Sequence, residues 1–217
     1  MSLNYLGPSA HRRMQVSKKP LINKKPLEKS PIILLLNGPS SSGKSTLAEL
    51  LQSKLKDPFL HIGIDKMIAM MPDKINNWEG GQSEQGFWWE EDTDSEGHQI
   101  YKIKMGPYAQ KVSQTYKEVV VTLAKNGHNI IVDEVAFGNK EIEIWREKLS
   151  EFNAFYIGIH CPLPTLEERE IARGDRIIGS ARHQFYTVHE DIKYDLEVDT
   201  ETHPLQECAE RIISLFQ

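Results

Sequence analysis

The segment from Gly38 to Ser45 reads G-P-S-S-S-G-K-S, which is a complete G-x-x-x-x-G-K-[ST] phosphate-binding motif. The apolar run 32–36 before it predicts a buried strand, and residues 44–56 after it predict an amphipathic helix. Strand, loop and helix N-terminus together form an anion cradle, because the loop N–H groups point inward and the helix dipole adds positive charge. A plain Gly/Ser-rich turn is the alternative, and the four correct motif positions weigh against it. The motif therefore constrains the fold around one strand–loop–helix unit and predicts nucleoside triphosphate binding.

The motif also assigns a role to each residue of the loop. Lys44 can reach the β- and γ-phosphates, and the hydroxyl of Ser45 can ligate Mg²⁺. ATP and Mg²⁺ are therefore the predicted nucleotide and metal. The residues predicted to bind them are Gly38, Ser40, Ser41, Ser42, Gly43, Lys44, Ser45 and Thr46.

Strands and helices alternate through the rest of the chain, which is typical of a parallel sheet covered by helices on both faces. We therefore predict a three-layer α/β domain over residues 31–217 with a five-stranded parallel sheet. The predicted strands are 32–36, 59–64, 129–132, 154–160 and 194–198, and the predicted helices are 44–56, 65–71, 107–126, 139–150, 164–173 and 204–216.

Residues 73–106 interrupt this alternation and predict an inserted lobe on the acceptor side, built around an irregular hairpin. Two adjacent tryptophans, Trp88 and Trp89, lie within it. They would either fasten the lobe to the core or line a ligand pocket, and fastening is the more common outcome.

Charge is distributed unevenly along the 217 residues. The net charge is −5, yet residues 1–30 hold seven basic side chains and one acidic one, so the remainder carries −11. An acidic body argues against binding of long nucleic acids. The basic segment predicts a disordered extension, with RNA, anionic lipid or an acidic protein as alternative partners.

The longest apolar runs are only as long as strands, so no membrane span is expected. Cys161 and Cys208 lie far apart and form neither a metal-ligand nor a redox spacing. Both features favour a cytoplasmic protein.

Carboxylates follow two of the predicted strands, at the sheet edge where open α/β sheets bind ligands. Asp133 and Glu134 follow the third strand, and Asp133 could hold Mg²⁺ through water or orient the acceptor. Asp65 follows the second strand and opens a short helix. Asp65 could therefore be a helix cap, a catalytic group or both.

Arg169, Arg173 and Arg176 recur at helical spacing and lead into a glycine-containing segment, 174–184. Small kinases close such a lid over the triphosphate, and lid arginines neutralise charge on the transferred phosphoryl group. A solvated helix with Glu/Arg pairs is the alternative. This alternative accounts for Arg169, but poorly for the R-G-D-R sequence that starts at Arg173.

These motifs, in this order, resemble the family of chloramphenicol phosphotransferase and its relatives. The resemblance rests on residues 37–45, 58–65, 71–72, 106–107, 130–135, 170–176, 188–190 and 194–200. It implies a mononucleotide-kinase type of P-loop NTPase fold, ATP as phosphoryl donor and a small-molecule hydroxyl as acceptor. It places Asp65 at the general base, and Asp133 and Arg176 in the active site. In this fold type we expect the second strand beside the phosphate-loop strand, with Asp65 on the acceptor side.

The departures from the family pattern concern the acceptor. Lys66 replaces a serine that directly follows the base, and it could recruit an anionic group. The insertion around Trp88 and Trp89 is bulkier. Phosphoryl transfer is therefore expected to carry over, whereas chloramphenicol as acceptor does not follow.

The sequence thus predicts an ATP- and Mg²⁺-dependent small-molecule kinase. Its predicted catalytic residues are Lys44, Asp65, Asp133, Arg173 and Arg176, and its predicted metal ligands are Ser45 and Asp133. One alternative is a nucleoside, nucleotide or polynucleotide-end kinase in which a tryptophan stacks on a base. Another is a nucleotide-binding switch without chemistry, against which Asp65, Asp133 and the lid arginines argue.

Overall fold

The computed structural model describes residues 30–174 and 177–217, so the basic segment through residue 29 and Arg176 lie outside it. Five parallel strands form the central sheet in the order β2-β5-β1-β6-β7. Their bounds are β1 Ile32–Asn37, β2 Phe59–Gly63, β5 Asn129–Glu134, β6 Asn153–His160 and β7 Leu196–Asp199.

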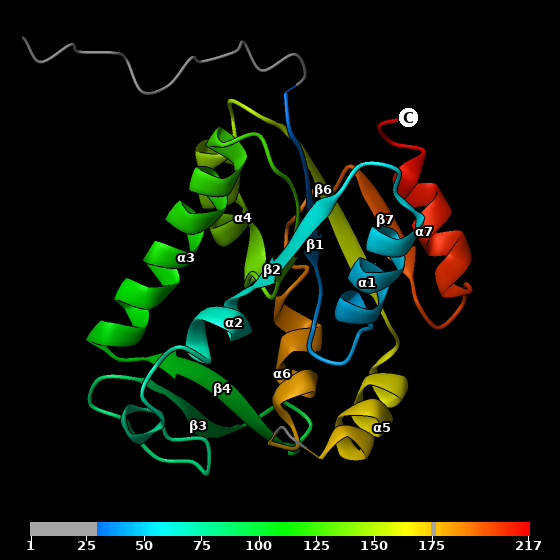
Figure 1. Cartoon of the computed structure of the whole chain (residues 1–217). Helices are drawn as coiled ribbons and strands as arrows, with labels where there is room; N and C mark the ends of the chain where they lie inside the picture. Colours follow the sequence, from blue (N-terminus) through cyan, green and yellow to red (C-terminus); the bar gives the residue numbers. More distant parts are fainter. Residues whose placement is uncertain (1–29, 175–176) are drawn as a thin grey trace, which may run out of the picture.

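Helices cover both faces of this sheet, as Figure 1 shows. Leu34 and Leu36 of β1 belong to the core shared with α1 and α7, whereas Ile33 and Leu35 belong to the core shared with α3 and α4. Successive strand residues point to opposite faces, so an uninterrupted apolar strand supplies both cores. The three-layer α/β prediction is confirmed. The helices are α1 Lys44–Lys54, α3 Pro107–Lys125, α4 Gly138–Lys148 and α7 Leu205–Ile213.

The expected position of β2 beside β1 is wrong, because β5 lies between them. Ile130, Ile131 and Val132 of β5 are fully buried, whereas Leu60 of β2 is 39% exposed. The more apolar strand takes the position covered on both faces and leaves the mixed strand at the sheet edge. Gly63 at the end of β2 still pairs with Asp133, so the β2 terminus stays at the active edge.

A helix that the sequence did not predict, α6 Ser180–Thr187, occupies much of the segment expected as a glycine-containing lid loop. It follows α5 Leu163–Arg173. The N-cap of α6 is Gly179, which has a φ of 101° and no capping side chain. The capping group comes instead from α5, and therefore no local capping signal marks the start of α6.

Glu170 of α5 supplies this cap and is completely buried. Its carboxylate accepts hydrogen bonds from the Gly179 amide at 2.7 Å, the Ser180 hydroxyl at 2.6 Å and the Ala181 amide at 2.8 Å. A negative charge at a helix N-terminus is favourable, and three donors satisfy both oxygens. Glu170 therefore fixes α6 to α5 across the lid segment.

Glu170→Gln should lower the free energy of unfolding by about 1–3 kcal/mol, because an amide cannot accept from all three buried donors. Urea denaturation followed by circular dichroism measures this loss. Glu168→Gln on the exposed side of the same helix is the matched control and should leave the midpoint unchanged. Equal midpoints for Glu170→Gln and wild type would contradict the capping role.

The inserted lobe is a regular antiparallel hairpin of β3 Phe87–Thr93 and β4 Gln99–Met105, not an irregular one. It follows α2 Ile64–Ile68 and the short 3₁₀ helix η1 Asp73–Ile75. Phe87 packs with Met71, which follows α2, and with Ala109 of α3. This contact places the hairpin against the segment after α2 and the start of α3 (Figure 1).

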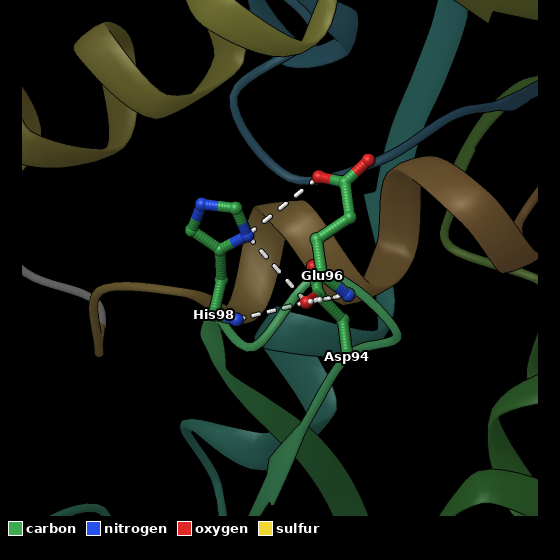
Figure 2. A group of neighbouring side chains, drawn as sticks. All are labelled: Asp94, Glu96 and His98. Atoms are coloured by element: carbon green, nitrogen blue, oxygen red, sulfur yellow. Dashed lines mark hydrogen bonds and ion pairs between the residues drawn. The ribbon is translucent and has the colours of Figure 1, made fainter.

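The tip of this hairpin is tied to α6 by Arg182, which is 7% exposed. Its guanidinium forms hydrogen bonds with Asp94 at 2.6 Å, Glu96 at 2.7 Å and His98 at 2.8 Å. Figure 2 shows the carboxylates of Asp94 and Glu96 and the imidazole of His98 close together at the hairpin tip. The hydrogen bond from Arg182 lowers the pKa of Asp94 to about 2. An arginine thus already supplies the cation for this cluster, which links hairpin and lid helix.

Within the described part of the chain, none of the helices combines the length and apolar character that crossing a bilayer requires.

Candidate active site

A cleft of about 790 Å³ opens at the carboxyl ends of the sheet strands. The phosphate loop forms one part of its lining, and α5 and α6 form another. The end of β2, the hairpin and α3 complete it. The predicted acceptor-side lobe and the phosphate loop therefore face one continuous space, which is the position expected for a ligand site in an open α/β sheet.

The phosphate loop has the backbone shape of an anion cradle. Gly43 caps α1 with a φ of 88°, and Ser41 has a φ of 65°, which is uncommon for a residue other than glycine. The hydroxyls of Ser41 and Ser42 are buried and have no hydrogen-bond partner among the described residues. Buried hydroxyls seldom lack partners, and Ser41 lines the cleft, so its hydroxyl fits a bound polyphosphate. Ser42 is fully buried and is not among the residues that line the cleft.

Lys44 lies folded against the loop and is only 6% exposed. Its ammonium donates to the carbonyl of Pro39 at 2.8 Å and lies 3.9 Å from Asp133 Oδ1. Lys44 lines the cleft, so its charge is available to a phosphate group there.

Ser45 and Asp133 meet as the sequence predicted. The Ser45 hydroxyl donates to Asp133 Oδ2 at 2.6 Å, and His61 Nε2 lies 3.6 Å from the same oxygen. Burial would raise the pKa of Asp133, but His61, the Lys44 charge and the Ser45 hydroxyl outweigh burial and hold the pKa below its ordinary value. An ionised carboxylate beside a hydroxyl offers the hard oxygen ligands that Mg²⁺ requires. The pair fits the predicted metal site.

Asp65 lies in the first turn of α2 and lines the cleft. Gly63, not Asp65, occupies the N-cap position of this helix. Asp65 is therefore not the N-cap of α2. The neighbouring Lys66 also lines the cleft, and its ammonium donates back to the carbonyl of His61.

Arg169 has a larger part in the site than the Glu/Arg-pair interpretation allowed. Its guanidinium donates to the Ser41 carbonyl at 3.5 Å, Thr200 Oγ1 at 3.3 Å and Glu201 at 3.1 Å. Arg169 therefore connects α5 to the phosphate loop and the end of β7. Only the proximity of a lid segment could have suggested this, since the helical spacing fits a surface helix equally well.

Of the other two lid arginines, the structure describes Arg173 but not Arg176. Arg173 is the last residue of α5, is exposed and lines the cleft. Arg176 lies outside the described residues, and its predicted role stays a prediction.

Sequence reasoning did not identify Gln184 and Thr200 as part of the loop's surroundings. The Ser40 amide donates to Gln184 Oε1 at 2.6 Å, and the Thr200 hydroxyl donates to the Ser42 carbonyl at 2.8 Å. Both contacts join residues more than a hundred positions apart, and no local pattern marks them.

An aromatic wall borders the cleft on the side of the inserted hairpin. It consists of Trp78, Phe87 and Trp89, with Trp78 and Phe87 stacked at 6.2 Å between ring centroids. Trp89 is 6% exposed, packs against Trp78 and lines the cleft. Trp88, in contrast, is not among the lining residues.

Glu134 also lines the cleft and is 7% exposed. Its carboxylate accepts from the Trp145 indole at 3.1 Å and the Val135 amide at 2.9 Å. Burial raises the pKa of Glu134 to about 7, and the nearby charge of Lys117 opposes this rise. Glu134 and Asp133 thus have different environments although they are adjacent.

This fold and site define the class of P-loop kinases and phosphotransferases, and solved structures of that class are similar. APS kinase CysC of Mycobacterium tuberculosis, in complex with AMPPNP and APS, superimposes with a TM-score of 0.59 at 16% identity. The match covers 86% of this chain and 98% of that one. A sugar kinase from Janibacter sp. HTCC2649 superimposes with a TM-score of 0.52 at 15% identity and covers 85% and 93%. At these identities the likeness shows the fold alone.

The chain belongs to the chloramphenicol phosphotransferase-like protein family, whose model matches residues 31–217. Two Mycobacterium tuberculosis proteins, from strains CDC 1551 / Oshkosh and ATCC 25618 / H37Rv, are each named "Putative O-phosphotransferase". Each is 26% identical over 186 residues, which are 85% of this chain and 82% of the relative. Family and fold together identify a phosphotransferase.

Proposed function

We propose that the protein transfers the γ-phosphoryl group of ATP to a hydroxyl group of a small molecule. One observation carries this proposal. The phosphate loop, the Ser45–Asp133 pair and Asp65 all line the same cleft as an aromatic wall that no nucleotide phosphate needs. Donor and acceptor would therefore meet within one cleft, which is what direct phosphoryl transfer requires.

Each residue has a role in this transfer. The loop amides and Lys44 would hold the β- and γ-phosphates, and Ser45 and Asp133 would hold Mg²⁺. When bound, this ion neutralises phosphate charge. Asp65 would take the proton of the acceptor hydroxyl while its oxygen forms a bond to the γ-phosphorus and the bond to the β-phosphate oxygen breaks, which releases ADP. Arg173 and Arg176 would stabilise charge on the transferred group.

An acceptor screen tests the function directly. Purified protein, ATP and Mg²⁺ are incubated with hydroxylated metabolites and amphenicol antibiotics, and ADP release and product mass are measured. Acceptor-dependent ADP formation with a mass gain of one phosphoryl group on the acceptor is expected. ATP binding by calorimetry without any acceptor-dependent ADP would favour the nucleotide-switch alternative instead.

The stacked pair of Trp78 and Phe87 supports a second candidate, a kinase that phosphorylates a nucleoside or a polynucleotide end. The acidic body disfavours a long nucleic acid. Nucleosides and 5′-hydroxyl oligonucleotides in the same screen separate the two candidates.

A further inference from the structure

One buried hydroxyl beside the cleft has no hydrogen-bond partner among the described residues. Tyr116 of α3 is 1% exposed, and its ring packs edge-on against Trp145 with centroids 5.5 Å apart. Its hydroxyl makes no hydrogen bond to any residue that the structure describes. Tyr116 nevertheless lines the cleft. The ring is thus accounted for by packing, whereas the hydroxyl is not.

An unpaired buried hydroxyl is unfavourable by roughly 1–3 kcal/mol relative to a paired one. Phenylalanine would give the same contact with Trp145 without this loss. A tyrosine here therefore indicates a hydrogen-bond partner that comes from solution, either an ordered water or a ligand.

The surroundings of this hydroxyl favour a ligand oxygen. Ser113, Tyr116 and Lys117 lie three and four residues apart on one face of α3, and all three line the cleft. Burial, followed by the charges of Glu134, Asp133 and Asp65, raises the pKa of Tyr116 well above its ordinary value. Tyr116 thus stays a neutral phenol that can donate, and it lies in the same neighbourhood as Asp65.

We propose that the Tyr116 hydroxyl donates a hydrogen bond to the oxygen of the acceptor hydroxyl and holds that oxygen beside Asp65. This assignment rests on the proposed phosphotransferase function. An alcohol oxygen has two lone pairs, so one can accept from Tyr116 while the other attacks the γ-phosphorus. The alcohol proton then points toward Asp65. Tyr116 would orient the attacking atom without exchanging a proton with it.

Tyr116→Phe removes this hydroxyl and keeps the ring. The assay is the slow hydrolysis of ATP with Mg²⁺, in which water takes the place of the acceptor, so no acceptor needs to be known. The water oxygen bonds to the γ-phosphorus, the bond to ADP breaks, and Asp65 receives the proton. We expect kcat to fall by on the order of 10-fold, because the loss of one hydrogen bond corresponds to about this change in rate. The Kd of a non-hydrolysable ATP analogue with Mg²⁺ should not change.

The matched control is Tyr108→Phe, which removes an exposed tyrosine hydroxyl from the same helix and should change neither quantity. A Tyr116→Phe variant that folds and hydrolyses ATP at the wild-type rate overturns the proposal, because the hydroxyl then binds only a structural water. An equal loss of analogue affinity also overturns it and moves Tyr116 to the nucleotide. If the wild type does not hydrolyse ATP, the two variants are compared with the acceptor that the screen returns, and an unchanged transfer rate in Tyr116→Phe then overturns the proposal. The acceptor screen judges the phosphotransferase function independently.

Discussion

Lys44→Ala is expected to abolish phosphoryl transfer, with a fall in rate of roughly 10²–10³-fold or more. The Lys44 ammonium donates to the Pro39 carbonyl at 2.8 Å and lies 3.9 Å from the Asp133 carboxylate, and Lys44 lines the cleft. A charge in this position would stabilise the β- and γ-phosphates as negative charge redistributes during transfer. The measurement is the rate of phosphoryl transfer from ATP to the acceptor that the screen returns.

Two controls separate catalysis from folding. Lys54→Ala removes a partly exposed lysine from the same helix and should leave transfer unchanged. Lys44 is buried, so its removal also shortens a packed side chain, and Lys44→Met keeps most of the aliphatic stem. Lys44→Met should show the same loss of transfer with a urea midpoint near wild type. Normal turnover in either Lys44 variant would contradict the donor site.

The sequence was sufficient for those parts of the site in which chemistry follows a local motif. The phosphate loop, Asp133 and Asp65 each follow a strand that ends in a polar segment, and the approach of Ser45 to Asp133 follows from the shared edge at which parallel strands end. Because parallel strands end at one edge, the carboxyl ends of β2 and β5 meet whatever their order. These residues were therefore placed together correctly, even though the strand order was not.

The rest depends on contacts between distant segments. Helix α6 was missed because its cap is Glu170 of another helix and its own N-terminus shows only Gly179. The part of Arg169 in the site was missed because an arginine at helical spacing is equally consistent with a surface pair. The position of β5 between β2 and β1 follows from a comparison of burial across strands, which chain order does not reveal.

The acceptor side illustrates the same limit. Adjacent tryptophans indicated an aromatic feature, yet the wall uses Trp89 together with Trp78 and Phe87, and Trp88 is not part of it. Strand alternation explains this outcome, since Trp88 and Trp89 of β3 point to opposite sides of the hairpin. Tyr116 gave no signal at all, because a tyrosine within an amphipathic helix is ordinarily a core residue.

Asp65→Asn is expected to separate a kinase from a nucleotide switch. Asparagine has nearly the same size as aspartate but cannot accept the hydroxyl proton, so transfer should fall by on the order of 10²–10⁴-fold. Stability should change little, because Gly63 and not Asp65 holds the N-cap position of α2. ATP binding by calorimetry should stay near the wild-type value, since the phosphate loop is unaltered.

Asp73→Asn provides the comparison for this variant, because Asp73 also lies in the first turn of a short helix but does not line the cleft. It should retain full transfer activity. If Asp65→Asn unfolds while Asp73→Asn does not, Asp65 is chiefly structural. If Asp65→Asn folds, binds ATP and transfers phosphate at the wild-type rate, the general base is another group. The other carboxylates that line the cleft are Asp133, which contacts Ser45 and Lys44, Glu134, which accepts from Trp145 and the Val135 amide, and Glu141, which accepts from the Phe137 amide. Asp65→Asn thus decides whether the base lies at the start of α2 or among these three carboxylates, which makes it the most decisive test of acceptor chemistry.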